Sequence, residues 1–166
     1  MRIIKETKKV YKFKELSQEA KDQAVENSNA NNNYPFLKED LTDYILEELK
    51  RLGFTITKDI NVFYSLSHSQ GDGFMFEGII SDKDFNTYSI KQNGYCYHEN
   101  SKIITGYNNE AEDIDVDDFD ENIYIPLCLR AKKRGYEEIE YESSEEYFKE
   151  ECEANEWEFL ENGSMY

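Results

Sequence analysis

The sequence is short of the residues that build disulfide-rich, zinc-binding or membrane-spanning proteins. Its 166 residues include three cysteines, Cys96, Cys128 and Cys152, with no Cys-x-x-Cys spacing. An odd number in that arrangement argues against a disulfide framework and a structural zinc site, and it suits a reducing cytoplasm. No run of about 18 apolar residues occurs, so no transmembrane helix is expected.

Two further absences concern the organisation of the chain. Residues 1–9 are charged and contain no apolar stretch of the kind found in signal peptides, so none is expected. The only prolines are Pro35 and Pro126, and no Pro-rich linker divides the chain. The sequence therefore predicts a single domain over residues 1–166, which is long enough to bury a core.

Aromatic residues are abundant in spite of the polar composition. Apolar residues make up 39% of the chain and aromatic residues 14%, with 13 Tyr and 10 Phe. A disordered chain is poor in aromatic side chains, so this composition indicates a folded protein.

Negative charge is the strongest compositional feature, and it is unevenly distributed. The net charge is −17; residues 1–109 contain 16 acidic and 14 basic side chains, whereas residues 110–166 contain 20 acidic and 5 basic ones. The last third therefore carries nearly all of the charge. Such a chain is not expected to bind DNA, RNA or anionic membranes, and its natural partners are basic surfaces, including nucleic-acid-binding grooves.

The clearest predicted element is an amphipathic helix over residues 38–52. Apolar side chains recur there at helical spacing, and Gly53 follows as a C-cap. Alternating patterns predict strand regions over 54–57, 61–67, 74–80 and 103–107. Asn93-Gly94 is a strong signal for a tight hairpin, so residues 88–92 are predicted to pair with 95–98.

Weaker patterns complete the prediction. Residues 10–13 alternate as a strand does, and Ser17 is a good N-cap for a short helix that ends in the polar segment 27–33. An acidic loop is predicted over 108–121, a helix over 123–135, a last helix capped by Ser143 or Ser144, and a terminal hairpin around 161–163. Strands in the middle and helices on either side predict an α+β fold: a largely antiparallel central sheet with N-terminal helices and one or two C-terminal helices.

Residues 67–73 form the segment most suggestive of a ligand loop. Polar side chains alternate there with two glycines, whose backbone amides could bind an anion. The candidate ligand-loop residues are His68, Ser69, Gln70, Gly71, Asp72 and Gly73. The segment lacks the Gly-rich patterns that bind nucleotide phosphates, and a hairpin turn with side-chain hydrogen bonds is the simpler interpretation.

Catalytic and metal-binding interpretations of the same residues are weak. Cys96 and His98 share a face of a predicted strand, and a mixed zinc site with His68 and Asp72 would require the fold to bring them together. A nucleophile made of Ser69, His68 and Asp72 is weaker still, because sequence neighbours rarely supply the geometry of a triad. No catalytic residue, metal or cofactor is therefore assigned.

Acidic residues of the last third suggest a partner-binding surface. The alternating acids of residues 110–121 lack the glycine and the leading helix of a calcium-binding EF-hand. These acids could form a solvated loop. They could also form a row of carboxylates that imitates the phosphates of nucleic acid, since duplex DNA carries one charge per about 1.7 Å of axis. The candidate partner-binding residues, including two aromatic anchors, are Glu112, Asp113, Asp115, Asp117, Asp118, Asp120, Glu121, Glu137, Glu138, Glu140, Glu142, Glu145, Glu146, Tyr147 and Trp157.

Several segments resemble a group of small, uncharacterised proteins of tailed bacteriophages. Residues 10–21 read Val-Tyr-Lys-Phe-Lys-Glu-Leu-Ser-Gln-Glu-Ala-Lys, which is similar to the opening of that group. Ser-Gln-Gly-Asp-Gly at 69–73 resembles its central segment, although Phe74 follows here without the intervening Ala-Cys. Residues 97–100, 153–159 and 161–163 are also similar. The resemblance implies a phage gene expressed in an infected bacterium, and it carries no activity.

These observations favour a binding protein over an enzyme. We expect an anti-defence protein that inhibits a bacterial immune nuclease or CRISPR effector in the cytoplasm of the infected host. Its acidic, nucleic-acid-mimicking surface would bind a basic surface of that protein or ribonucleoprotein. Two other hypotheses stay open: binding or cleavage of a small ligand, such as a nucleotide or metal, by residues 67–73 with His98, and a phage accessory role in which the acids only confer solubility.

Overall fold

The computed structural model describes residues 7–30 and 34–166. Residues 1–9, for which no signal peptide is expected, and the polar segment 27–33 thus lie partly outside the described residues. Residue contacts divide the chain, for which the sequence predicted a single domain, into two compact units. The sheet unit consists of residues 35–137, and the terminal unit consists of residues 1–34 and 138–166. No helix in the described part of the chain is both long and apolar enough to cross a membrane.

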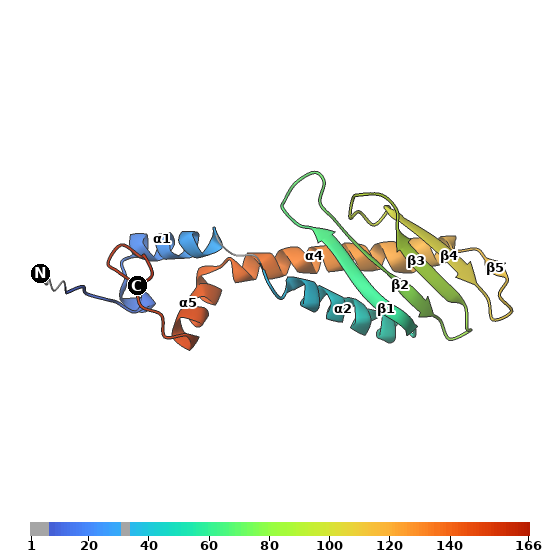
Figure 1. The fold of residues 1–166 in the computed structure, drawn as a ribbon, viewed down its shortest axis with the longest axis horizontal. Coiled ribbons are helices and arrows are strands. Elements are labelled where there is room, and N and C mark those ends of the chain that lie inside the picture. Colours follow the sequence, from blue (N-terminus) through green and yellow to red (C-terminus); the bar gives the residue numbers. More distant parts are fainter. Residues whose placement is uncertain (1–6, 31–33) are drawn as a thin grey trace, which may run out of the picture. The chain divides into compact units, whose positions relative to one another are not determined.

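The sheet unit contains a five-stranded antiparallel meander in the order β1-β2-β3-β4-β5 (Figure 1). Its strands are β1 Thr55–Ser65, β2 Gly73–Ser81, β3 Thr87–Gln92, β4 Lys102–Tyr107 and β5 Asp113–Ile114. With the helices described below, this sheet confirms the predicted α+β class and the antiparallel pairing.

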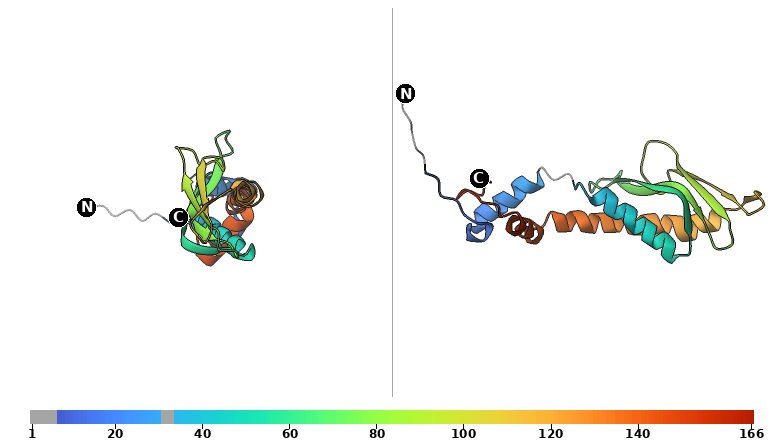
Figure 2. Two further views of the ribbon diagram at one scale, coloured as in Figure 1. Left: turned by 90° about the vertical axis from the view of Figure 1, so that its right-hand side faces the viewer. Right: turned by 60° about the horizontal axis from the view of Figure 1, so that its bottom comes forward.

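Two helices cover one face of the sheet, as Figure 2 shows. In α2, Leu37–Arg51, apolar residues four apart are buried, which confirms the helix predicted from that spacing: Leu37, Leu41, Ile45 and Leu49. In α4, Ile125–Glu142, the buried residues are Leu127, Cys128, Ala131 and Gly135. A Cβ at Gly135 would overlap Cδ1 of Leu66, so the glycine lets α4 pack closely against the end of β1.

The helix-covered face of the sheet carries the core of this unit. Val62, Phe76 and Ile80 are almost completely buried on it. Tyr124 is also fully buried. It ends a π-helical turn, Asp120–Tyr124, which follows the short helix α3, Asp117–Phe119. Its hydroxyl donates to the carbonyl of Phe76 (3.0 Å) and accepts from the Phe76 amide (3.3 Å), so this buried phenol is hydrogen-bonded to β2.

Strand β1 is a single strand with two register shifts, one between Ile56 and Lys58 and one between Lys58 and Asn61, whereas the sequence predicted two strand regions. Lys58 pairs with Ile79 and Asn61 pairs with Glu77, so β1 contains one extra residue over that interval. A Cβ on Gly78 would lie 2.6 Å from Cδ1 of Ile60, so the glycine in β2 leaves room for the bulged side chain.

The predicted hairpin at Asn93-Gly94 is wrong. Strand β3 pairs with β4, and residues 93–101 form a long loop closed by a hydrogen bond from the Asn93 amide to the Ser101 carbonyl (2.9 Å). The ring of Tyr97 stacks on Phe63 at 5.8 Å, on the side of the sheet away from the helices. Residues 95–98 therefore cross that face of the sheet instead of extending β3.

The terminal unit has a separate aromatic core. It contains a 3₁₀ turn, Phe13–Glu15, then α1, Gln18–Asn29, and α5, Glu145–Ala154. Serine N-caps begin both helices: Ser17 accepts from the Ala20 amide and Ser144 from the Tyr147 amide, as the sequence predicted. The core is formed by Phe13, Leu16, Ala20, Ala24, Phe148, Cys152 and Phe159.

The predicted strand over residues 10–13 is reduced to one bridge. Tyr11 pairs with Phe159, which in turn pairs with Met165 in the predicted terminal hairpin. The chain then turns because the Glu15 carboxylate accepts from the Lys12 amide at 2.7 Å, and because Phe13 is buried 5.3 Å from the Phe148 ring. Local alternation therefore did not determine the conformation of this segment.

Candidate functional site

The ligand-loop candidate, residues 67–73, joins β1 to β2 and is organised around Asp72. The buried Asp72 carboxylate accepts hydrogen bonds from the amides of Ser67 (2.7 Å) and Ser69 (3.0 Å). It also accepts from the hydroxyls of Ser67 and Ser69, both at 2.9 Å, of Ser65 at 3.3 Å, and of Tyr136. A carboxylate offers about four lone-pair positions, so these donors occupy its hydrogen-bonding capacity.

Helix α4 supplies two contacts to this loop that sequence reasoning missed. Tyr136 donates to the carboxylate, and Lys132 Nζ donates to the Asp72 carbonyl at 2.7 Å. Lys132 and Tyr136 are four residues apart and therefore lie on one face of a helix, and this spacing was the available sign that they act together. Nothing in the sequence indicated that this face of α4 meets residues 67–73.

The pKa values agree with an ionised, structural carboxylate. Desolvation raises the pKa of Asp72, but hydrogen bonds from Tyr136, Ser69 and Ser67 outweigh it and hold this pKa well below its usual range. Desolvation and the bond to Asp72 raise the pKa of Tyr136 to about 12. Asp72 is thus a charged acceptor at neutral pH, and Tyr136 remains a donor.

The remaining side chains of the loop do not form a nucleophilic triad. Ser69 Oγ bonds directly to Asp72, whereas the His68 ring lies against the Tyr136 ring at 4.6 Å. Gln70 and Gly71 are exposed, and the buried Gly73 contacts the backbone of residues 97–98. The loop as placed is a structural junction between a hairpin and α4.

The proposed zinc ligands are engaged elsewhere. Cys96 Sγ lies 3.0 Å from the Ser101 hydroxyl, and His98 Nε2 lies 3.3 Å from Oε1 of Glu99. Within residues 7–30 and 34–166, no three His, Cys, Asp or Glu side chains are grouped to hold a metal ion.

The acidic residues of 110–121 lie on the sheet unit, and most face solvent. Glu112, Asp113, Asp115, Asp117, Asp118 and Glu121 are exposed. Asp120 differs, because its Oδ2 pairs with Nζ of Lys102 at 2.8 Å and the Lys102 side chain is only 7% exposed. Asp120 therefore anchors the π-helical turn to β4 and is the least available of these acids to a partner.

The acids of 137–153 begin near the end of α4 and continue along α5. Glu137 pairs with Lys133 at 3.3 Å, Glu138 and Glu142 are half-buried, and Glu140 is exposed. Four acids of α5 are exposed, whereas Phe148 and Cys152 of the same helix are buried in the core. We call these the α5 acids: Glu145, Glu146, Glu150 and Glu153.

The two proposed aromatic anchors are half-buried within the terminal unit. Tyr147 meets the Tyr141 ring edge to face at 5.4 Å, and Trp157 packs 6.0 Å from Phe148. Trp157 contributes to the aromatic core and offers a partner only part of its surface.

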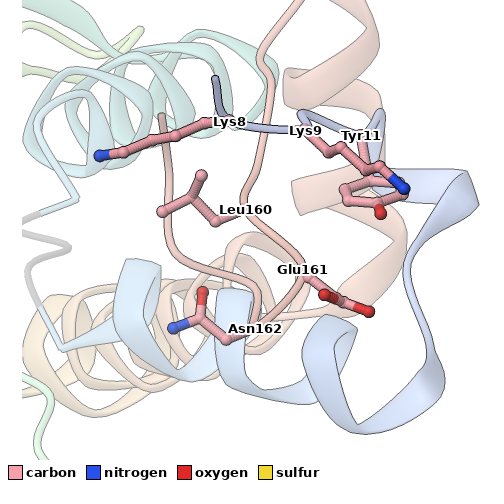
Figure 3. A pocket seen from close by; sticks show the side chains of 6 residues that line it. All are labelled: Lys8, Lys9, Tyr11, Leu160, Glu161 and Asn162. Atoms are coloured by element: carbon pink, nitrogen blue, oxygen red, sulfur yellow. The ribbon is translucent and has the colours of Figure 1, made fainter. Parts of the chain in front are cut away.

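Two hollows in the described part of the terminal unit have the size of a small-ligand site. One, of about 410 Å³, is lined by Lys8, Lys9, Tyr11, Leu160, Glu161 and Asn162. Figure 3 shows that the Lys8 and Lys9 side chains extend in opposite directions, so their ammonium groups do not converge. The other, of about 500 Å³, borders Cys152 and Trp157; burial raises the pKa of the Cys152 thiol to about 11, which disfavours a nucleophilic thiolate.

The negative charge of the chain is therefore carried mainly by exposed carboxylates. In the loop of residues 67–73, by contrast, the Asp72 carboxylate is engaged in hydrogen bonds within the protein. Comparisons of the chain with protein-family models, with curated proteins and with solved structures gave no match.

Proposed function

We propose that this protein is a stoichiometric inhibitor that binds a basic, nucleic-acid-binding surface of a bacterial defence nuclease or CRISPR effector. The observation that carries the proposal is the concentration of 20 acidic and 5 basic residues in 110–166. Most of these acids are exposed, whereas Phe119, Tyr124, Phe148 and Phe159 of the same segment are buried in the cores. The resemblance to phage proteins supports an infected bacterial cytoplasm as the setting.

The spacing of the α5 acids supports imitation of a phosphate backbone. Glu145 to Glu153 spans eight residue steps, which is about 12 Å at the α-helical rise. Four exposed carboxylates and one exposed base, Lys149, lie within that length. Their net charge corresponds to one negative charge per roughly 4 Å, close to the 3.4 Å per phosphate of one DNA strand.

Such a surface would act by occupying the channel that the target's nucleic acid requires. Opposite charges accelerate the encounter and fix its orientation, and salt screens both effects. Catalysis has less support, because the carboxylate and serine hydroxyls best placed to act are committed to each other around Asp72.

A matched pair of charge variants tests this proposal. The first replaces the four α5 acids with Gln. The control replaces four exposed acids from the first 109 residues, as Asp22→Asn, Glu26→Gln, Asp43→Asn and Glu47→Gln, and removes the same charge. Tagged proteins are used to capture partners from the bacterial host at low and high salt, with DNA or RNA as competitor.

We expect the wild type and the control to retain one nucleic-acid-binding protein at low salt, and nucleic acid to displace it. The α5 variant should retain much less of that protein. Equal retention by both variants, or retention unaffected by salt and by nucleic acid, would contradict the proposal.

A further inference from the structure

The turn between β2 and β3 displays an aromatic side chain in an unfavourable backbone conformation. Phe85 is 72% exposed and has a φ of +63°. Glycine and asparagine usually occupy this left-handed region, because a Cβ there approaches the backbone and destabilises the conformation. A bulky side chain in that position suggests a functional requirement.

Hydrogen bonds to Asp82 hold the turn rigidly. Its Oδ1 accepts from the amides of Asp84 and Asn86, both at 2.9 Å, and its Oδ2 accepts from the Asn86 side chain at 2.9 Å. The hydroxyl of the buried Tyr88 donates to Oδ2 at 3.3 Å, which connects the turn to the core. Phe85 is therefore presented on an ordered support, and little conformational entropy would be lost when a partner binds it.

The surroundings of Phe85 are acidic. Thr87 pairs with Tyr107, and Tyr107 pairs with Asp113, so the β2–β3 and β4–β5 turns lie at the same end of the sheet (Figure 1). Within 82–86 and 108–115 one base, Lys83, accompanies six acids: Asp82, Asp84, Glu110, Glu112, Asp113 and Asp115. Tyr107, 39% exposed, adds apolar surface at this end.

We propose that Phe85 is the anchor by which the sheet unit docks on a protein partner, in an apolar patch rimmed by lysine and arginine. Aromatic side chains that enter apolar patches dominate the energetics of many interfaces. The acids around Phe85 select the basic rim and disfavour nucleic acid and anionic lipid. The basic character of the partner rests on the proposed function, whereas the anchoring role rests on the geometry of Phe85.

The test uses a defined probe, a fluorescent amphipathic helical peptide of leucine and lysine, which presents an apolar stripe flanked by positive charge. Its Kd is measured for the full-length wild type, Phe85→Ala and Tyr95→Ala. Tyr95 is the matched control, because it is a fully exposed aromatic in the loop after the opposite end of β3. We expect Phe85→Ala to raise the Kd by about tenfold and Tyr95→Ala by less than about twofold.

A second variant separates loss of the anchor from loss of folding. Phe85→Gly removes the ring and relieves the backbone conformation, so it should raise Tm while weakening peptide binding as Phe85→Ala does. Three outcomes would contradict the anchoring role of Phe85. They are wild-type affinity in Phe85→Gly, equal effects of Phe85→Ala and Tyr95→Ala, and no binding of the peptide to the wild type.

Salt distinguishes this inference from the proposed function. Binding that depends on Phe85 but is unchanged between about 50 and about 500 mM NaCl would leave the anchor in place and contradict the electrostatic function. Binding that depends on salt and on the acids but not on Phe85 would contradict the anchor and leave the electrostatic function in place.

Discussion

At the residue scale, the carboxylate of Asp72 joins β1, β2 and α4. The sequence presented it as a candidate ligand because histidine, serine and aspartate stood close together in a predicted turn. The partners that decide its role, Lys132 and Tyr136, are about 60 residues further along the chain. The sequence therefore favoured a turn with side-chain hydrogen bonds, which the structure contains, but it could not show that α4 supplies two further hydrogen bonds to Asp72.

The lowered pKa of Asp72 predicts a specific pH dependence of stability. Because the folded pKa lies below the unfolded value, ionised Asp72 stabilises the fold above the unfolded pKa of about 4, and this contribution is lost as pH falls through the folded pKa. Asp72→Asn should therefore be less stable than the wild type at pH 7, and the difference should shrink below about pH 4. Urea unfolding from pH 7 to pH 2.5 measures it.

The control for that experiment is His68→Ala in the same loop. His68 contacts Tyr136 only through its ring, so its removal should change stability little and should not alter the pH profile. A difference between Asp72→Asn and the wild type that stays constant from pH 7 to pH 2.5 would show that ionisation of Asp72 is not the stabilising factor.

At the element scale, the sequence was informative where local chemistry determines the structure. The spacing of Leu37, Leu41, Ile45 and Leu49 predicted α2, and the serine caps predicted the starts of α1 and α5. The prediction failed where pairing depends on distant residues. Asn93-Gly94 had the composition of a tight turn, but residues 95–98 gain contacts with Phe63 and the backbone of Gly73 that no local pattern encodes.

The close approach of that loop to β2 predicts opposite outcomes for two glycines. A Cβ at Gly73 would lie 2.6 Å from the Tyr97 carbonyl oxygen and 2.7 Å from Cα of His98, whereas a Cβ at Gly71 meets no atom within 4 Å. Gly73→Ala should lower the free energy of unfolding by about 1–3 kcal/mol, as overpacking does. Gly71→Ala should change it by less than about 0.5 kcal/mol or raise it slightly.

Urea unfolding of the two variants, with amide hydrogen exchange over residues 93–101, measures both effects. Loss of protection in that loop should accompany Gly73→Ala alone. Equal stability of the two variants would mean that the loop moves away from β2 at little cost.

At the scale of the whole molecule, both units are acidic. The sheet unit has a net charge of −9 and the terminal unit one of −8. Within the terminal unit, residues 1–34 have a net charge of +2 and residues 138–166 one of −10, so the two ends of the chain attract each other. Lys12 illustrates this attraction, because its Nζ donates to the Glu156 carbonyl at 2.8 Å and lies 3.6 Å from Oε1 of Glu158.

These opposing contributions predict how stability depends on salt. Exposed ion pairs such as Lys12–Glu158 are weak, whereas repulsion within a chain of net charge −17 acts over its whole surface. Raising NaCl from about 20 to about 300 mM shortens the Debye length from roughly 20 Å to roughly 6 Å and screens both. We expect Tm to rise by several degrees, because repulsion is the larger contribution, and to rise less in the variant that lacks the four α5 acids.

Choline chloride should give the same increase in Tm if screening is the cause. A Tm that falls with salt would mean that attraction between the ends of the chain outweighs the repulsion.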